Sequence, residues 1–269
     1  MDRMVIDIQS GLDECGIKLG RRIGIDATPL EAMFNDEDAK YNGHYEISGY
    51  KIHGVYDLDY EIPLAIIITT AEKGDSPIFR ELLKRVHDKL GINFEEVYAD
   101  GAYNGFENFA LVHMTYNAKL YTNIDKDSVY REDGTEKGIQ YAYNRLRNKP
   151  DFQPPDNLTL KDKMEFLMKY GVYDPIGAYY RNIHMREWEQ WKQDKEENGD
   201  KIPYHLRNLT EGFHGYVKKY LNLQVYLDYR GIRNAERHIR WSFLAILGIV
   251  LTRVQNGIVD DLIQIAYFG

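Results

Sequence analysis

Short hydrophobic runs separated by polar turns organise the first half of the chain. Three of these runs predict strands: one that begins at Arg22 and ends at Asp26 before a turn at Pro29, and two at 47–58 and 62–70. The third run is almost entirely apolar, which is typical of a strand buried on both faces. Only a short polar link separates the second and third runs, so we expect these two strands to be antiparallel.

Helices and strands alternate after this point. Asp75 or Ser76 is expected to cap a helix that has Pro77 in its first turn and that ends at Gly91. The next three expected elements are a strand, a helix and a strand, at 94–100, 105–116 and 118–124. This order predicts an α/β fold in which helices connect parallel strands.

Two of the predicted strands end in an aspartate, Asp26 and Asp100. Ligands of open α/β sheets bind at the carboxyl ends of the strands, which makes both residues candidates for a site. For Asp26 alone, a turn-forming role is an equally good interpretation. Lys51 and His53 share one face of their strand, either near such a site or, as we favour from the sequence, on a solvent-facing sheet edge.

The pattern changes between residues 125 and 203, where charged residues and prolines are frequent. We expect an insertion of helices and loops with little core of its own. Trp188 and Trp191 lie three residues apart on a predicted helix, which favours packing, with gripping of unstacked bases as the alternative. A second helical pattern, at 232–265, predicts a buried C-terminal helix or helix pair. Its expected core stripe contains Trp241, Leu244, Leu247, Val250, Leu251 and Val254.

Between these two regions lies a helical segment with four notable side chains. Tyr204, Arg207, Glu211 and Lys218 are separated by three, four and seven residues, which places all four on one helical face. Taken by itself, this arrangement is typical of a solvated charged face. Together with Asp26, however, it suits a metal ion beside a phosphate backbone.

Composition and charge narrow the class of protein. The chain has 269 residues, of which 43% are hydrophobic and 28% charged, as in ordinary globular proteins. Its net charge is −8, which is unlike the usual basic nucleic-acid binder. Residues 201–240, however, contain eight Lys or Arg and three Asp or Glu, a surplus of five that leaves −13 on the rest. A local patch can therefore attract polyanions although the whole chain is acidic.

The single cysteine, Cys15, excludes an intramolecular disulfide framework and a cysteine-rich zinc site. The N-terminal residues show no secretory signal. The longest apolar run, at 241–251, is shorter than the roughly 20 residues that span a bilayer. We therefore expect a cytoplasmic protein without membrane association.

Asp26, Asp100 and Glu211 form a set of hard oxygen donors. Without companion cysteines, such a set favours Mg²⁺ or Mn²⁺ over zinc. Two such ions about 3.5–4 Å apart activate a water or a hydroxyl group and stabilise the leaving oxygen in phosphoryl transfer. Arg207 and Lys218 would then hold the phosphate backbone of a nucleic acid.

The same residues carry a resemblance to a known family. Tyr204, Arg207, Glu211 and Lys218 match the Tyr-x2-Arg-x3-Glu-x6-Lys signature of insertion-sequence transposases of the IS4-like group. The segments IDAT around Asp26 and YADGAY around Asp100 resemble the segments that carry the first and second aspartates of that family, and GYKIH and DSPIF resemble its intervening blocks. The resemblance covers about residues 22–255.

This resemblance implies a ribonuclease H-like mixed sheet flanked by helices, with a mainly helical and loop insertion before the last catalytic helix. Together with the residue pattern, it predicts a leader at 1–21, a catalytic domain at 22–124 and 204–269, and an insertion at 125–203. Asp26, Asp100 and Glu211 would bind two Mg²⁺ or Mn²⁺ ions, and Tyr204, Arg207 and Lys218 would contact DNA.

The implied activity is metal-dependent strand cleavage and strand transfer at the terminal inverted repeats of an insertion sequence. The implied partners are double-stranded DNA and further copies of the chain in a synaptic complex, in association with the nucleoid. Only 25 residues precede Asp26, whereas family members usually carry an N-terminal DNA-binding domain there. This suggests, as an alternative, a truncated, non-catalytic regulator that binds DNA or other transposase chains. A ribonuclease H-like nuclease with another purpose is a third interpretation.

Overall fold

The computed structural model describes most of the chain, namely residues 1–123, 136–147, 157–171, 173–198, 206–220, 223, 230–260 and 262–263. These residues divide into two compact units. The first unit consists of Met1–Asp100 and His205–Gly269, and the second of Gly101–Tyr204. All residues of the predicted site that the structure describes belong to the first unit.

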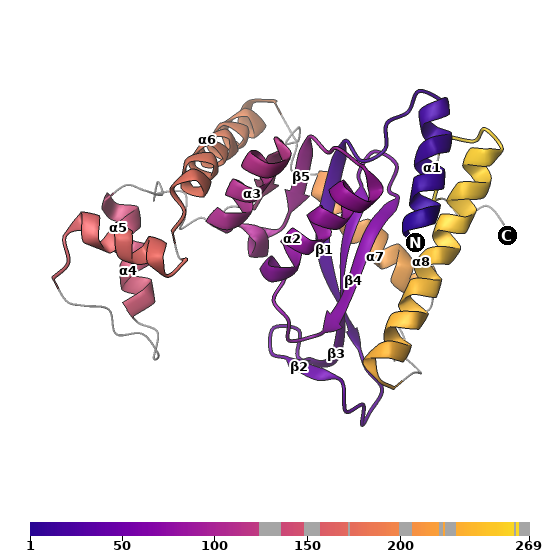
Figure 1. Ribbon diagram of the computed structural model, residues 1–269, viewed down its shortest axis with the longest axis horizontal. Helices are drawn as coiled ribbons and strands as arrows, with labels where there is room; N and C mark the ends of the chain where they lie inside the picture. Colours follow the sequence, from indigo (N-terminus) through magenta and orange to yellow (C-terminus); the bar gives the residue numbers. More distant parts are fainter. Residues whose placement is uncertain are drawn as a thin grey trace. The chain divides into compact units, whose positions relative to one another are not determined.

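A mixed sheet forms the centre of the first unit (Figure 1). Its central strand β1 is antiparallel to β3 and parallel to β5, which confirms the expected α/β class and agrees with a ribonuclease H-like fold. On one edge of β3, β2 pairs with its first residues and β4 with the rest, both antiparallel. The strands are β1 (Arg22–Glu31), β2 (Lys40–Asn42), β3 (Ile47–Asp57), β4 (Pro63–Thr70) and β5 (Glu96–Ala99).

Strand β1 is longer than the sequence predicts. The expected turn at Pro29 is wrong, because β1 continues to Glu31 and Pro29 pairs with Lys51 of β3. The parallel pairing of β1 with β5 stops at Ile25 and Ala99. Beyond that point, pairing with β5 no longer requires a backbone N–H from β1, so a proline is tolerated there.

Four α-helices of the first unit are described: α1 (Asp2–Glu14), α2 (Ser76–Lys84), α7 (Asn208–Tyr220) and α8 (Ile232–Gln255). Helix α2 starts as expected, with Asp75 at the N-cap position, and continues as the π-helical turn η1 (Arg85–Lys89). Helix α1 lies beside α8 (Figure 1), and their contact is close enough that a Cβ atom at Gly11 would meet Val254.

The buried face of α8 differs from the expected stripe. Trp241 is 66% exposed, so its assignment to the core is wrong. The buried positions are Ala235, Ile239, Ser242, Phe243, Ile246, Leu247, Val250 and Val254. Trp241 lies two residues, or about 200°, from Ile239 on the helical wheel and therefore points away from this face.

The second unit consists mainly of helices. Helix α3 packs against α6, and α4 packs against α5. The amino end of α5 carries the capping box of Thr159 and Asp162, in which each side chain bonds to the backbone N–H of the other. The described elements are the 3-10 turn η2 (Gly101–Tyr103), α3 (Phe106–Tyr116), β6 (Lys119–Thr122), α4 (Glu136–Arg147), α5 (Leu160–Lys169) and α6 (Pro175–Asn198).

Trp188 belongs to a small core on α6. It is 9% exposed and packs with Met185 and Trp191, which supports packing over base gripping for this side chain. In the part of the chain that the structure describes, none of the helices combines the length and the apolar character needed to cross a bilayer.

His184 makes the second unit sensitive to acid. Its ring is buried, and Nε2 lies 3.1 Å from the backbone N and 2.8 Å from the carbonyl O of Thr122. Burial lowers the pKa of His184 to about 4. The unfolded chain, with a histidine pKa of about 6.5, therefore binds more protons between pH 6.5 and 4, and the unit loses roughly 3 kcal/mol as the pH falls through this range.

We expect acid unfolding of the second unit to be visible in tryptophan fluorescence, because the rings of Trp188 and Trp191 lie 6.0 and 6.1 Å from that of His184. His184→Gln should lower stability at pH 7.5 but flatten its dependence on pH below 6.5. The exposed His44 provides the matched control, and His44→Gln should retain the wild-type profile. An unchanged profile in His184→Gln would contradict the assignment.

Candidate active site where the parallel pairing of strands β1 and β5 ends

Two aspartates lie side by side at the end of the parallel β1–β5 pairing. The last parallel pair is Ile25 with Ala99, so Asp26 and Asp100 are each the first residue beyond it. The expected position of Asp26 at a strand tip is wrong, because β1 continues, but the two carboxylates still meet at one place. Burial raises the pKa of Asp26 and the charge of Asp100 raises it further, so the two carboxyls are within range of each other's charge.

Helix α7 packs on β1 at this point of the strand. Gly24 allows the close approach, because a Cβ atom there would lie 2.3 Å from Cγ2 of Thr210 on α7. Asp26 is 7% exposed beneath the helix, and Oγ1 of Thr210 lies 3.3 Å from its Oδ2 atom. A small residue two positions before Asp26 thus determines how closely α7 can approach the carboxylate.

We expect Gly24→Ala to separate α7 from β1. The added methyl group would also lie 2.7 Å from Leu58 Cδ2, and such overpacking costs about 1–3 kcal/mol. Thermal unfolding should show this loss. Gly212→Ala on α7 is the matched control, because its Cβ would meet nothing within 4 Å, and it should be neutral or slightly stabilising. Equal stabilities of the two variants would contradict the close packing at Gly24.

Arg207 joins two of the predicted carboxylates. It lies in the turn just before α7, where its Nη2 atom is 3.7 Å from Oδ1 of Asp26 and its Nη1 atom is 2.8 Å from Oε1 of Glu211. The Arg207 side chain is 17% exposed and that of Glu211 is 56% exposed. The structure therefore brings Glu211 to Asp26 through a guanidinium group.

Of the two remaining residues predicted to contact DNA, the structure describes Lys218 but not Tyr204. Lys218 is half-buried on α7, where burial lowers its pKa and the charge of Asp26 acts in the opposite direction. Tyr204 lies outside the described residues. Arg207 and Lys218 are thus both close enough to Asp26 to sense its charge.

His214 and Tyr56 are two further polar residues at the site that the sequence interpretation missed. Nδ1 of His214 lies 3.7 Å from Oδ2 of Asp26, and its Nε2 atom lies 2.6 Å from the hydroxyl of the fully buried Tyr56. The signal for His214 was present, since it is seven residues after Arg207 and four before Lys218 on the same helical face. Tyr56 had no such signal, because it is 158 residues away from His214.

Burial controls the protonation of this site. It raises the pKa of Asp26 to about 6, against the opposing effects of Arg207 and of the N–H of Ala27, which donates to Oδ1. Burial, together with the positive charges of Lys218 and Arg207, lowers the pKa of His214 to about 3. His214 is therefore neutral at pH 7, and its approach to Asp26 is a polar contact between a neutral ring and a carboxylate.

The site contains donors that suit a hard divalent cation, but they are not gathered into a complete set. Among the residues that the structure describes, no group of three or more His, Cys, Asp or Glu side chains is placed to hold a metal ion. Asp26 and Asp100 nevertheless fit such an ion, because they are two neighbouring carboxylates; burial raises the pKa of Asp26, and the charge of Asp100 raises it further.

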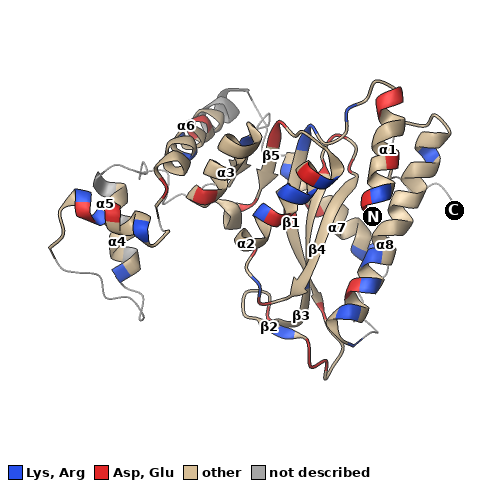
Figure 2. Cartoon of the chain, viewed as in Figure 1, with Lys and Arg blue, Asp and Glu red and all other residues tan. Residues whose placement is uncertain are grey.

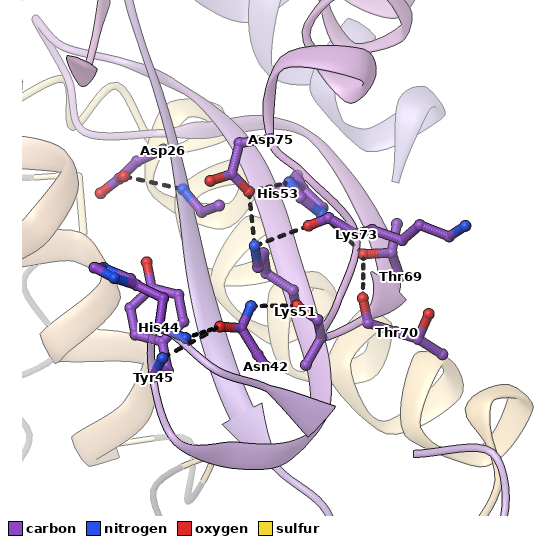
Figure 3. A network of polar contacts seen from close by, with 12 residues as sticks. Asp26, Asn42, His44, Tyr45, Lys51, His53, Thr69, Thr70, Lys73 and Asp75 are labelled. Atoms are coloured by element: carbon purple, nitrogen blue, oxygen red, sulfur yellow. Dashed lines mark hydrogen bonds and ion pairs between the residues drawn. The ribbon is translucent and has the colours of Figure 1, made fainter. Parts of the chain in front are cut away.

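A second polar network lies on β3 and extends to the start of α2 (Figure 3). Nζ of Lys51 lies 2.9 Å from both Oδ1 of Asp75 and the carbonyl O of Lys73. His53 is fully buried, with Nδ1 3.5 Å from the same Asp75 oxygen and Nε2 2.9 Å from Oγ1 of Thr69. Lys51 is 3% exposed. The favoured interpretation of Lys51 and His53 as part of a solvent-facing edge is therefore wrong.

Tyr45 connects this network to the aspartates. Its ring lies 5.8 Å from Nζ of Lys51. Burial raises the pKa of its hydroxyl, and the charges of Asp75, Asp26 and Asp100 raise it further. Asp75 and the two candidate catalytic aspartates thus act on one hydroxyl group, which supports the alternative that Lys51 and His53 lie near the site.

Comparisons with known proteins identify a family and two similar solved structures. Residues 18–246 match the family model described as a transposase DDE domain. The solved structures that are similar include a piggyBac transposase synaptic complex with hairpin DNA, with a TM-score of 0.34 and 9% identity over 94% of this chain and 59% of that chain. They also include a Drosophila P element transposase strand transfer complex, with a TM-score of 0.24 and 12% identity over 90% of this chain and 68% of the other. The chain thus spans 59% of the length of the piggyBac chain. Comparison with curated proteins finds no match.

Proposed function

The chain belongs to the transposase DDE domain family, and from this premise we propose that it cleaves DNA strands and transfers them at the terminal inverted repeats of an insertion sequence. The observation that carries the proposal is the pairing of Asp26 and Asp100 one residue beyond the last parallel pair of β1 and β5. Arg207, just before helix α7, and Glu211 on it bring a cationic and a carboxylate side chain to Asp26, which suits phosphoryl transfer.

Asp26, Asp100 and Glu211 are the residues that would hold two Mg²⁺ or Mn²⁺ ions. Such ions supply an activated water or 3′-hydroxyl and neutralise charge on the leaving oxygen. Their ligands must be ionised, so the raised pKa of Asp26 predicts that cation binding releases protons near pH 6.

The residues around the carboxylates position and balance them. Thr210 and the N–H of Ala27 contact the two oxygens of Asp26, and His214, held by Tyr56, lies beside one of them. Arg207 balances Asp26 and Glu211 and can turn its planar guanidinium to a phosphate. Lys218 and, by resemblance, Tyr204 complete the proposed grip on the DNA backbone.

The partners are double-stranded DNA, as transposon ends and target, and further copies of the chain that join two ends in a synaptic complex. The catalytic domain comprises residues 22–124 and 204–269, and residues 125–203 form an insertion in it, after a leader at 1–21. Association with the nucleoid in the cytoplasm follows from the same activity.

The proposal is tested with supercoiled DNA that carries the inverted repeats flanking the chain's own coding sequence. Purified protein should nick and join this DNA in Mg²⁺ or Mn²⁺ but not in EDTA, and Glu211→Gln should be inactive. Glu37→Gln, an exposed change far from α7 in the sequence, is the control. Cleavage that needs no metal, or that Glu211→Gln retains, would overturn the proposal.

The ion pair between Arg207 and Glu211 favours a second candidate function. A carboxylate held by an arginine is compatible with a regulator that binds DNA or other transposase chains without cutting. A gel-shift assay run beside the cleavage assay separates the two functions, because only the regulator binds the repeats and leaves them intact.

A further inference from the structure

The outer face of the first half of α8 carries an exposed stripe of two arginines and a tryptophan, Arg233, Arg237 and Trp241, here called the α8 stripe. Its members are four residues apart, so each lies about 6 Å further along the helix axis on nearly the same face. Both arginines are exposed, and Trp241 is 66% exposed.

In the part of the chain that the structure describes, no carboxylate forms an ion pair with either arginine of this stripe. Arg240, close by, is paired with Glu236, whereas among the described residues neither Arg233 nor Arg237 forms an ion pair. Asp36 and Asp38 approach the start of α8, but they accept hydrogen bonds from the backbone N–H groups of residues 231 and 232. Figure 2 shows Lys and Arg gathered on this half of the helix.

Trp241 is exposed although α8 has a buried face that packs against neighbouring elements. The opposite face of α8 is filled by residues that pack against α1 and β4. A large aromatic side chain held in solvent on the same face as two exposed arginines is unusual for a surface that only faces water. Its indole offers a flat apolar surface with one N–H donor, and the arginines offer planar forks that match phosphate oxygens.

We propose that the α8 stripe is a second contact surface for DNA, in which Arg233 and Arg237 pair with phosphates of the duplex backbone and Trp241 packs against the adjoining sugars. The partner is inferred from charge, because these two arginines are exposed and form no ion pair among the described residues, although the chain has a net charge of −8. The inference rests on the proposed function only for the identity of the partner as DNA, and it assigns binding energy to residues outside the carboxylate site.

Salt-dependent binding tests the proposal. The full chain is titrated against a fluorescein-labelled 30-base-pair duplex of arbitrary sequence, in EDTA so that no cleavage occurs, at several NaCl concentrations. Each phosphate contact contributes about 0.9 to the slope of log K against log salt. Arg233→Gln with Arg237→Gln should therefore reduce the slope by about 2 and weaken binding roughly tenfold or more at 0.1 M salt.

Trp241→Ala should weaken binding severalfold and leave the slope unchanged, because it removes no charge. The matched control is Arg80→Gln with Lys84→Gln on α2, which removes two exposed charges at the same four-residue spacing in the same unit. This control should retain the wild-type slope. Thermal unfolding confirms that all variants are folded.

An unchanged slope in the arginine double variant, or an equal reduction in the α2 control, would overturn the proposal. A second copy of the chain is the other partner that could bind such a surface, and light scattering measures whether the variants change the oligomeric state. Altered oligomeric state with unchanged DNA affinity would likewise overturn DNA binding by the stripe. Failure of the proposed catalysis is distinguishable, because a protein that never cuts can still show the stripe-dependent slope in EDTA.

Discussion

Asp26→Asn is expected to abolish metal-dependent DNA cleavage. The carboxylate is the centre of the site, contacted by Arg207, Thr210 and His214, and Asn supplies one neutral oxygen in place of an anionic donor. Loss of about 4 kcal/mol of electrostatic stabilisation corresponds to a roughly thousandfold slower reaction. Nicking of supercoiled substrate under single-turnover conditions measures the effect.

The same variant should keep or gain stability in the absence of metal. Burial raises the pKa of Asp26 to about 6. A carboxyl whose folded pKa lies above its unfolded value of about 3.9 lowers stability progressively as the pH rises between the two values, and the full loss is present above the folded pKa. Asparagine removes this cost at pH 8 and still accepts from the N–H of Ala27. Thermal unfolding at pH 8 in EDTA is the measurement.

Asp88→Asn, at a half-exposed carboxyl of η1, serves as the control for both assays and should behave like the wild type. Wild-type cleavage by Asp26→Asn would remove Asp26 from the catalytic role. Unfolding of Asp26→Asn at pH 8 would instead assign Asp26 a structural role, in which its contacts with α7 stabilise the fold.

Asp75→Asn is expected to destabilise the first unit strongly. Asp75 is the carboxylate partner of Lys51, whose side chain is 4% exposed. Removing one partner of a buried ion pair leaves an uncompensated charge, which typically costs about 3–5 kcal/mol. Urea unfolding followed by far-UV circular dichroism should show a lower midpoint without a change in the end states.

A second substitution distinguishes loss of charge balance from loss of shape. Lys51→Met combined with Asp75→Asn removes the unpaired cation and retains similar volume, so it should recover much of the stability that Asp75→Asn loses. Asp88→Asn, which breaks the exposed pair of Asp88 with His87, is the comparison, because exposed pairs contribute about 0–1 kcal/mol to the free energy of unfolding. A loss below 1 kcal/mol in Asp75→Asn would contradict the importance of the buried pair.

Local sequence patterns determined the elements that carry the site. The apolar run at 62–70 and the short link before it predicted the antiparallel β3–β4 pair, and the Asp-Ser-Pro segment predicted the start of α2. The four-residue spacing of Arg207 and Glu211 predicted that the two side chains are neighbours, and they form an ion pair. These features follow from periodicity, capping and turn chemistry, which act within a few residues of the chain.

Tertiary structure alone decided which side chains are buried and which meet. Lys51 and His53 alternate as expected of a strand, but burial followed from the position of β3 between β1 and β4, which no local pattern specifies. Trp241 fits a helical apolar stripe equally well, yet the face that α1 and β4 cover excludes it. Periodicity defines the faces of an element, and only its neighbours determine which face is covered.

For the candidate site as well, some features follow from the sequence and others only from the tertiary structure. From the sequence by itself, Asp26, Asp100 and Glu211 are candidates, because each follows an apolar run that predicts a strand or lies on a patterned helix. The sequence could not show that Arg207 stands between Asp26 and Glu211, or that Tyr56 reaches His214 from 158 residues away. Those contacts depend on how closely α7 approaches β1 at Gly24, a distance that packing across the whole unit determines.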